Sequence, residues 1–158
     1  MPGLIVNGLY KLKDDYFREF GNPSMMDNKY ESRPYYYIFK DNDNIDWAIP
    51  LSSQVENYER KIENEEAKRG KGKCIYYHIG EIGSKKSVFL ISDMLPIEEK
   101  YIKGPFTIDK RPYVSKNMNQ IRAVRSKATR YLNLLQSRVL RDNLGVLKIK
   151  ATILSRRK

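Results

Sequence analysis

The chain lacks most of the residues that metal sites, disulfides and serine hydrolases need. Its 158 residues include one cysteine, Cys74, and one histidine, His78. A single cysteine excludes an intramolecular disulfide and fits a reducing compartment, so we expect a cytoplasmic protein. This pair cannot form a structural zinc site, and the shortage of histidine argues against a serine triad, whose hydroxyl needs a neighbouring base. We therefore expect no metal and no cofactor, and we favour a structural or exposed role for His78 over a catalytic one.

Long apolar runs and intact ion-binding or nucleotide-binding motifs are also missing. No stretch approaches the roughly 18 to 20 residues that cross a bilayer, and the apolar run 4–6 is too short for a signal-peptide core. The segment DNDNID has Asp46 where a calcium loop needs glycine. The segment GSKKS, 83–87, lacks the second glycine of a phosphate loop. The sequence therefore predicts neither kind of site.

Acidic residues are scarce in the C-terminal third. From Lys110 to Lys158 there are 14 Lys or Arg residues and a single acid, Asp142, a net charge of +13. Residues 1–109 carry 16 basic and 18 acidic groups, so the C-terminal third holds the whole excess of a chain with net charge +11. Such asymmetry is typical of proteins that bind nucleic acid or an anionic membrane surface. Twelve tyrosines add side chains that stack on bases or bind phosphates.

Two aromatic-rich segments in the middle of the chain predict a β-hairpin. Residues 35–39 favour a strand, the polar residues 41–44 favour a turn, and a second apolar segment begins at Trp47. We expect Pro50 to end that second strand, because proline cannot continue a central strand. Ser52 and Ser53 would then lie at the rim of a sheet, as phosphate-binding hydroxyls or as the residues of a turn or helix cap.

The other elements are expected to form one domain, 1–158, around this hairpin. The pattern predicts a strand at 9–12, a short helix at 14–20 capped by Asp14, and a loop at 21–34. A second hairpin is expected from 73–79 and 87–91, a short edge segment at 94–97, and an irregular connector at 105–112. Residues 54–73 fit a solvated helix or mobile excursion, or alternatively a loop that closes over a ligand through Lys68, Arg69, Lys71 and Lys73.

A long helix is expected from Ser115, because apolar residues recur at intervals of three and four: Met118, Ile121, Val124, Ala128, Leu132, Leu135 and Val139. Gly145 is expected to end it, and the tail 146–154 alternates like a strand. Basic residues off the apolar stripe can solubilise an exposed face or line a groove that holds RNA. We favour RNA binding through Lys116, Arg122, Arg125, Lys127 and Arg130, together with Lys68 and Lys71.

The order of these features resembles one family. Six features follow one another from about residue 9 to 140. They are an aromatic strand and helix, a loop tyrosine, a basic residue before the aromatics, the segment PLSS, the segment ISDMLPI and a basic helix that opens with NQIRA. This arrangement resembles the type III toxin–antitoxin endoribonucleases, the ToxN, AbiQ and CptN group, and CptN-like members most. The resemblance implies an α+β fold, with a compact, strongly bent, barrel-like antiparallel sheet flanked by helices, similar to the MazF and Kid toxins.

The same resemblance implies a function in phage defence by abortive infection. Such a toxin cleaves cellular or phage mRNA without a metal, as the ribose 2′-hydroxyl attacks the adjacent phosphorus and leaves a 2′,3′-cyclic phosphate and a 5′-hydroxyl. It is inhibited by a repeated pseudoknot RNA antitoxin, which it processes from a precursor and holds in a closed protein–RNA ring.

The resemblance also assigns site residues. The hydroxyl pair falls on Ser52 and Ser53, which would orient the 2′-hydroxyl or the scissile phosphate. The basic residue falls on Arg33, which would stabilise transition-state charge. The loop and helix tyrosines fall on Tyr30 and Tyr16, which would position a base or phosphate.

Two departures from the family pattern matter. Gln54 and Val55 stand where a lysine often follows the hydroxyl pair, and the spacing from the loop tyrosine to the basic residue is one residue shorter than in ToxN-like members. The missing charge can come from Lys61, Lys68 or His78.

Two other function classes fit the composition. A non-catalytic RNA-binding module would use the tyrosines as stacking platforms and the basic third as a backbone clamp, but it leaves Arg33, Ser52 and Ser53 without a task. A basic protein-interaction or membrane-surface domain requires an exposed amphipathic face, whereas the apolar stripe of the long helix is more simply explained as core.

Overall fold

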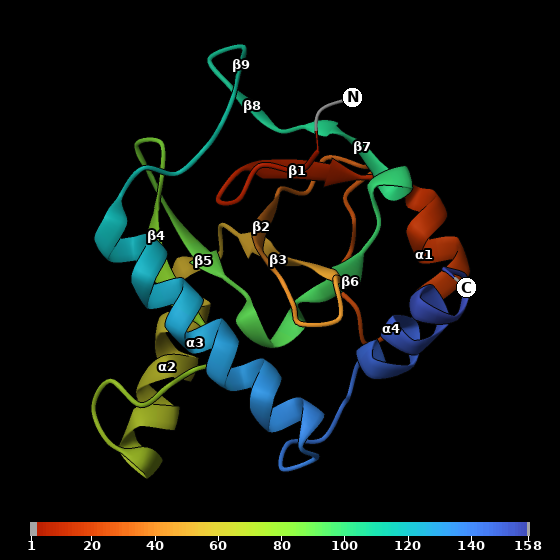
Figure 1. Cartoon of the computed structure of the whole chain (residues 1–158). Helices are drawn as coiled ribbons and strands as arrows, with labels where there is room; N and C mark the ends of the chain where they lie inside the picture. Colours follow the sequence, from red (N-terminus) through yellow and green to blue (C-terminus); the bar gives the residue numbers. More distant parts are fainter. Residues whose placement is uncertain (1–2, 158) are drawn as a thin grey trace.

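Helices and a bent antiparallel sheet make up residues 3–157, the part of the chain that the computed structural model describes (Figure 1). The strands are β1 (Leu9–Leu12), β2 (Tyr35–Lys40), β3 (Asp46–Ser52), β4 (His78–Ile82), β5 (Lys85–Phe89), β6 (Leu95–Ile97), β7 (Ile102–Pro105), β8 (Thr107–Ile108) and β9 (Arg111–Pro112). The helices are α1 (Asp14–Phe20), α2 (Val55–Arg69), α3 (Met118–Gln136) and α4 (Val146–Ser155), with 3-10 turns at Ile91–Asp93 and Glu99–Tyr101. The expected α+β fold is confirmed. Among these residues, no helix combines the length and apolar character needed to cross a bilayer.

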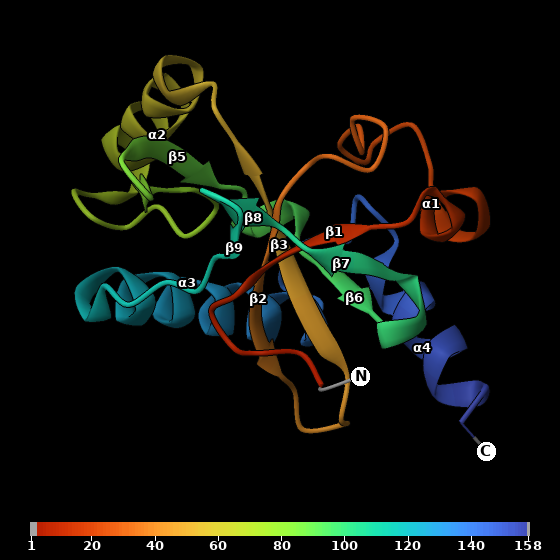
Figure 2. The same ribbon diagram turned by 90° about the horizontal axis from the view of Figure 1, so that it is seen from above.

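One edge of β3 serves two partners, and this bends the sheet. The strand order is β4-β5-β3-β2-β1-β7, with β6 paired to β3 outside that path. Residues Asp46–Ala48 of β3 pair with β6, whereas Leu51 and Ser52 pair with β5, all antiparallel. The edge therefore passes from one strand to another and the sheet curves into the expected barrel-like core. Helices α2 and α3 lie on one side of it and α1 and α4 on the other (Figure 1, Figure 2).

Pro50 does not end β3, so that prediction is wrong. The backbone N–H of Leu51 donates to the Pro34 carbonyl on the β2 side, at 3.1 Å. Backbone groups alternate sides along a strand, so the nitrogen of Pro50 points to the opposite edge, between β6 and β5. The Pro50 carbonyl on that edge accepts from the Leu90 N–H at 3.0 Å. The N–H that Pro50 lacks is thus at the point where the pairing of β3 changes from β6 to β5, so β3 continues to Ser52.

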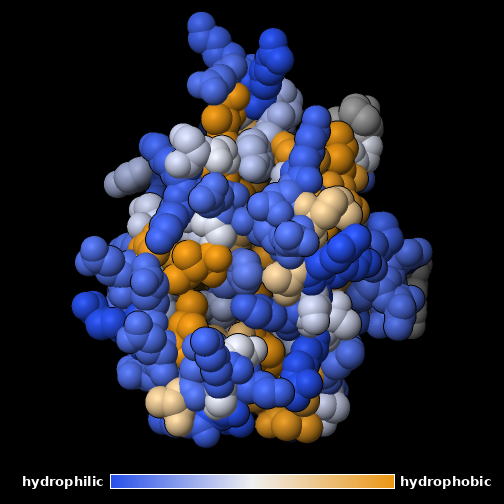
Figure 3. Space-filling view, turned by 90° about the vertical axis from the view of Figure 1, so that its left-hand side faces the viewer, coloured by the Kyte–Doolittle hydropathy of each residue, from blue (hydrophilic) through white to orange (hydrophobic). Residues whose placement is uncertain are grey.

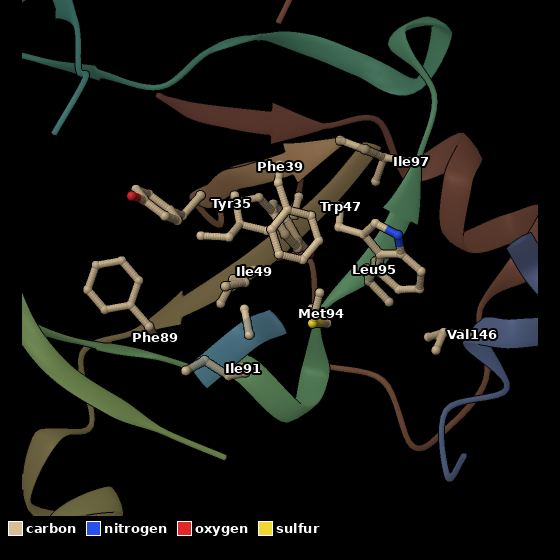
Figure 4. Packing of buried hydrophobic residues seen from close by; sticks show 14 of the residues in the cluster. Tyr35, Phe39, Trp47, Ile49, Phe89, Ile91, Met94, Leu95, Ile97 and Val146 are labelled. Carbon is tan, nitrogen blue, oxygen red and sulfur yellow. The ribbon is translucent and has the colours of Figure 1, made fainter. Parts of the chain in front are cut away.

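The core fills the inside of the bent sheet (Figure 4). Trp47, Tyr35 and Phe89 are buried there together with Ile49 and Leu95. All of β3 and nearly all of β2 are buried on both faces. This explains why the two strands have continuous apolar sequences instead of alternating ones.

Helix α3 covers the edge strand β4 through one glutamine. The Gln120 side chain accepts from the Glu81 backbone N–H at 2.7 Å and donates to the Glu81 carbonyl at 3.0 Å, so it satisfies both edge groups. A Cβ atom at Gly80 would stand 2.2 Å from the Gln120 side-chain oxygen. Glycine is therefore required at that position for the helix to approach.

Several boundaries differ from the sequence-based expectation. Helix α1 is present, but its N-cap is Lys13, and Asp14 lies in the first turn. The second hairpin is present, but β4 begins only at His78 and the turn is limited to residues 83–84. The connector 105–112 contains the small hairpin β8–β9. The segment after the first hairpin is helix α2, in agreement with the solvated-helix interpretation.

The C-terminal tail is helix α4, so the predicted strand is wrong. Helix α3 ends at Gln136, and Gly145 precedes α4 in a left-handed conformation instead of ending α3. Val146, Ile149 and Ile153 are buried at helical spacing. The apolar residues of this short segment match both periods, and burial of one face against the sheet decides for the helix.

Lys150 of α4 joins the hairpin turn to the C-terminal helix. Its ammonium lies 2.9 Å from Asp41 and 2.8 Å from Asp43, and Asp41 also accepts from the Trp47 indole at 2.8 Å. Burial opposes ionisation of Asp41, but these hydrogen bonds hold the pKa of its carboxyl below the usual value. The two carboxylates of the DNDN segment, Asp41 and Asp43, therefore form ion pairs with Lys150.

We predict that Lys150→Ala lowers the free energy of unfolding by about 3 kcal/mol, because it leaves the buried Asp41 carboxylate without its ion partner. Urea unfolding followed by circular dichroism measures the change, and Lys148→Ala on the exposed face of the same helix is the control. Equal midpoints for the two variants would contradict a stabilising role for this pair.

Candidate functional site

A pocket of about 420 Å³ lies where β3 ends, and the predicted serine pair lines it. Its walls come from the end of β3, the β4–β5 turn and the connector after β7. The lining is rich in hydroxyls and carries two lysines: Lys29, Pro34, Leu51, Ser52, Ser53, Ile82, Gly83, Ser84, Lys85, Ser87, Phe106, Thr107 and Ile108. Antiparallel pairing of Ser52 with Val88 brings the β5 hydroxyl of Ser87 to the same rim. Such a surface can accept an anion.

The two serines have different environments. Ser52 is buried, and its Oγ accepts from the Gln54 backbone N–H at 3.1 Å, which is a turn contact. Ser53 is exposed in the pocket. Ser52 therefore shapes the backbone at the end of β3, while Ser53 has a hydroxyl free to meet a ligand.

Arg33 lies beside this pocket and clamps its base. The side chain is 4% exposed, and it donates from Nε to the Asp27 carbonyl and from one Nη to the Leu51 carbonyl, both at 2.6 Å. Within residues 3–157, no carboxylate lies within 4 Å of this guanidinium. Two of its five N–H donors are used, so three donors remain, and the charge has no ion-pair partner among these residues. Its field favours an anion near the end of β3.

Tyr30 projects from a strained loop next to the pocket. Lys29, Tyr30 and Glu31 all have positive φ, at 50°, 56° and 67°, a conformation that non-glycine residues rarely adopt. The Tyr30 side chain is 95% exposed, while its neighbour Lys29 lines the pocket. Strain of this kind persists only where surrounding contacts impose it, and it concentrates at functional sites.

Contacts on both sides of Tyr30 impose this conformation. The buried Asn28 amide donates to the Leu12 carbonyl and to the Asp14 carboxylate, at 3.0 and 2.9 Å. The Glu31 carboxylate accepts from the Asp14 backbone N–H at 2.7 Å and pairs with Lys103 at 2.9 Å. These contacts hold the Glu31 pKa below its usual value. These contacts therefore fix the backbone of the loop on both sides of the exposed Tyr30.

Tyr16 lies elsewhere. The structure places it in the core of α1, wholly buried, with its hydroxyl donating to the Pro96 carbonyl at 2.7 Å. Burial raises the pKa of this hydroxyl well above its usual value. Its ring packs against Phe17, Phe20 and Tyr101. Ser52 and Ser53 line the pocket, Arg33 donates to the backbone of the lining residue Leu51, and Tyr30 follows the lining residue Lys29 in the chain. Tyr16 does not line this pocket.

The predicted RNA-binding residues fall on two faces of α3. Lys127 and Arg130 line a groove of about 490 Å³ with Lys73 and with Arg69, whose guanidinium pairs with Glu65 at 2.5 Å. Among the described residues, none that lines this groove is acidic. Arg122 is exposed two turns before Arg130 on this side of the helix. The side of the molecule with α2, the β4–β5 hairpin and the start of α3 is mostly hydrophilic (Figure 3).

Arg125 belongs to the other face of α3. Its guanidinium stands 5.7 Å from the Phe39 ring centre and lines a separate pocket that includes Asp41, Asp43 and Lys150. Charges of both signs meet there, so this pocket is less suited to a polyanion than the groove. Lys116, Lys68 and Lys71 are exposed, and none of them lines either pocket.

None of the three candidates for the missing family lysine lines the serine pocket. Burial, with the neighbouring Lys127, lowers the pKa of His78 to about 4, and the Lys127 ammonium stands 2.9 Å from its Nδ1, so His78 is neutral. Lys61 lies 4.7 Å from the Tyr58 ring centre, and Lys68 is exposed on α2. The lysines that line this pocket are Lys29 and Lys85.

Sequence reasoning missed these two lysines. Lys85 belongs to the GSKKS segment, which fails as a phosphate loop but places hydroxyls and a cation in a tight turn. The pairing of β5 with β3 brings that turn beside Ser53. Only the hydroxyl-rich, basic character of the segment was visible in the sequence.

Comparisons with known proteins bear on the fold. No family model matches the sequence, and no curated protein matches it. A chain from the solved structure described as "A processed non-coding RNA regulates a bacterial antiviral system" shares the fold, with a TM-score of 0.53 and 14% identity over 84% of this chain and 88% of that one. At this identity the match establishes a common fold.

We predict that Arg33→Lys lowers the free energy of unfolding by about 2 kcal/mol, because one ammonium cannot reproduce the two-pronged contact with Asp27 and Leu51. Chemical denaturation measures the loss. The exposed Arg60→Lys of α2 is the matched control and should unfold like the parent chain. A stability for Arg33→Lys equal to that of this control would rule out the clamp.

Proposed function

We propose that the protein is a metal-independent endoribonuclease toxin of a type III toxin–antitoxin system. One observation carries the proposal: an accessible serine hydroxyl, Ser53, shares a pocket with Lys29 and Lys85, beside the guanidinium of Arg33, which has no ion-pair partner within residues 3–157. The exposed, rigidly held Tyr30 adds a surface on which a base can stack. This combination suits a phosphodiester of single-stranded RNA.

In the proposed reaction the ribose 2′-oxygen attacks the adjacent phosphorus as the bond from phosphorus to the 5′-oxygen breaks. The products are a 2′,3′-cyclic phosphate and a 5′-hydroxyl. The Ser53 hydroxyl donates to a non-bridging oxygen, and Arg33, Lys29 and Lys85 stabilise the charge that develops on the phosphate. Water takes the proton of the 2′-hydroxyl, and a pocket lysine protonates the leaving oxygen. Among the described residues that line the pocket there is no carboxylate or imidazole, so positioning and electrostatics carry the rate.

An RNA antitoxin is the partner that this function implies. The solved structure that shares the fold belongs to a bacterial antiviral system regulated by a processed non-coding RNA. The basic groove lined by Lys127, Arg130 and Lys73, with Arg69 paired to Glu65, supports a polyanionic partner on this chain. We propose that a repeated pseudoknot RNA, processed by the toxin itself, occupies the groove and the cleavage pocket within a closed protein–RNA ring.

A non-catalytic RNA-binding module is the second candidate. The 95% exposure of Tyr30 favours it, since a stacking platform requires no chemistry. The two candidates differ in what Ser53 does: a binding module tolerates its loss, whereas a nuclease does not.

We predict that the purified protein cleaves cellular RNA in EDTA and that Ser53→Ala reduces the rate roughly 10²- to 10³-fold, because an oxyanion donor is lost. End mapping should find cyclic phosphates and 5′-hydroxyls. Ser155→Ala on α4 is the matched control and should cleave normally. Tight binding without cleavage by any of these proteins would favour the binding module, and cleavage that stops in EDTA would contradict the metal-free mechanism.

We predict that Arg130→Gln weakens RNA binding at low salt and reduces the slope of log affinity against log salt by about 0.7, the value for one lost phosphate contact with a single strand. Fluorescence anisotropy with Ser53→Ala protein measures the slope without cleavage. Lys148→Gln, exposed on α4, removes the same charge outside the groove. If both substitutions change the slope equally, the groove is not the RNA path.

A further inference from the structure

A second pocket, of about 410 Å³, has walls suited to a flat aromatic ligand. Tyr76, Tyr77 and Tyr131 line it, together with the carboxylate of Asp93 and the exposed Arg141. Three aromatic rings, one acid and one cation at the rim form a different chemistry from the hydroxyl-rich serine pocket. The catalytic proposal uses none of these side chains.

The tyrosine walls are held in place. The Tyr131 hydroxyl donates to the Ser92 carbonyl at 3.2 Å, and its ring meets Tyr76 edge to face, with centres 6.1 Å apart. Tyr77 packs against Tyr58 with ring centres 4.9 Å apart. A preorganised aromatic surface stacks a base without losing much side-chain entropy on binding.

Asp93 provides an acceptor without a protein donor. Within residues 3–157, its carboxylate makes no hydrogen bond and no ion pair. Burial raises its pKa to about 6, against the opposing charges of Lys61 on α2 and Arg33 before β2. Near neutral pH the group is ionised, and a partly buried carboxylate in that form needs donors. A ligand that supplies them completes the pocket.

We propose that this pocket binds a guanine base of RNA, with Asp93 accepting from guanine N1–H and N2–H and the tyrosines stacking on the ring. This inference rests on the proposed function, and the substrate feature that the protein would recognise is a guanine base in the RNA. It makes Asp93 a specificity-determining residue that lies outside the cleavage pocket.

The carboxylate selects guanine by its donor pattern. A carboxylate has two oxygens that only accept. Guanine alone among the four RNA bases has two adjacent donors on its Watson–Crick edge, so it alone can pair with both oxygens. Adenine and cytosine offer one donor next to an acceptor, and uracil offers one donor between two acceptors. An unpaired base turned out of a strand exposes that edge.

The two pockets lie along one segment of chain. The 21–34 loop contributes Lys29 to the pocket that contains Ser53 (the serine pocket) and Ser24 to the pocket lined by Tyr76, Tyr77 and Tyr131 (the tyrosine pocket). Arg33 at its end donates to the Leu51 carbonyl under the first pocket, and its charge lowers the pKa of Asp93 in the second. The 21–34 loop therefore borders both pockets.

The test measures binding with cleavage switched off. Full-length Ser53→Ala protein is titrated with four labelled heptamers, UUUGUUU, UUUIUUU, UUUAUUU and UUUCUUU, where I is inosine, which lacks the 2-amino group. We expect the guanine heptamer to bind about tenfold more tightly than each of the others, because one bidentate pair is replaced by a single contact or none. Asp93→Asn in this Ser53→Ala protein should remove most of the preference for guanine. Acidification below about pH 6 should do the same in the Ser53→Ala protein that keeps Asp93, because it protonates the carboxylate.

Two further variants separate recognition from folding. Glu63→Gln, exposed on α2, removes the same charge as Asp93→Asn and should keep the preference. Tyr76→Ala should weaken all four heptamers about equally, because stacking does not depend on base identity. Equal affinity for the four heptamers, or a preference that survives Asp93→Asn, would overturn the proposal. A preference for free 5′-GMP over the other nucleotides with none among the heptamers would overturn it too. Because no step requires cleavage, a negative result here is distinct from a failure of the nuclease itself.

Discussion

The exchange of partners along one edge of β3 determines where the candidate site lies. Pairing passes from β6 to β5 across Pro50, whose missing N–H falls at the gap between those two strands. The sheet must bend at that position, and β5 arrives beside the last residues of β3. The turn that β5 shares with β4 therefore stands next to Ser53. A straight sheet with one partner for β3 would leave these hydroxyls apart.

Three cations, the buried Lys150 and Arg33 and the half-buried Lys127, have different electrostatic partners. Lys150 is neutralised by two carboxylates, and its role is to join α4 to the hairpin. Lys127 meets a neutral histidine, and burial lowers its pKa. Within residues 3–157, the Arg33 side chain donates to backbone carbonyls only, which fix its position without cancelling its charge. Of the three, Arg33 is the one whose field remains available to a phosphate at the end of β3.

The 21–34 loop owes its value to rigidity. Its anchors, Asn28 and Glu31, reach back to β1 and α1, so a turn of three left-handed residues is maintained at the surface. A flexible loop would lose conformational entropy each time RNA bound. A fixed loop has already lost that entropy during folding. The 21–34 loop borders both the serine pocket and the tyrosine pocket.

The sequence by itself determined the elements whose local pattern is unambiguous: the aromatic hairpin, the amphipathic α3, and the separation of basic residues into the C-terminal third. The order of short motifs was also enough to indicate the bent α+β fold. It could not determine α4, because the apolar spacing of Val146–Leu154 fits a strand and a helix equally and only packing against the sheet distinguishes them.

Nor could the sequence show that Tyr16 is enclosed in the core, that α3 divides its basic residues between two faces, or that Lys29 and Lys85 line the same pocket as Ser53. These facts depend on contacts between residues far apart in the chain. Sequence spacing determines which local element a residue enters, whereas tertiary packing decides which groups from different elements share one electrostatic environment.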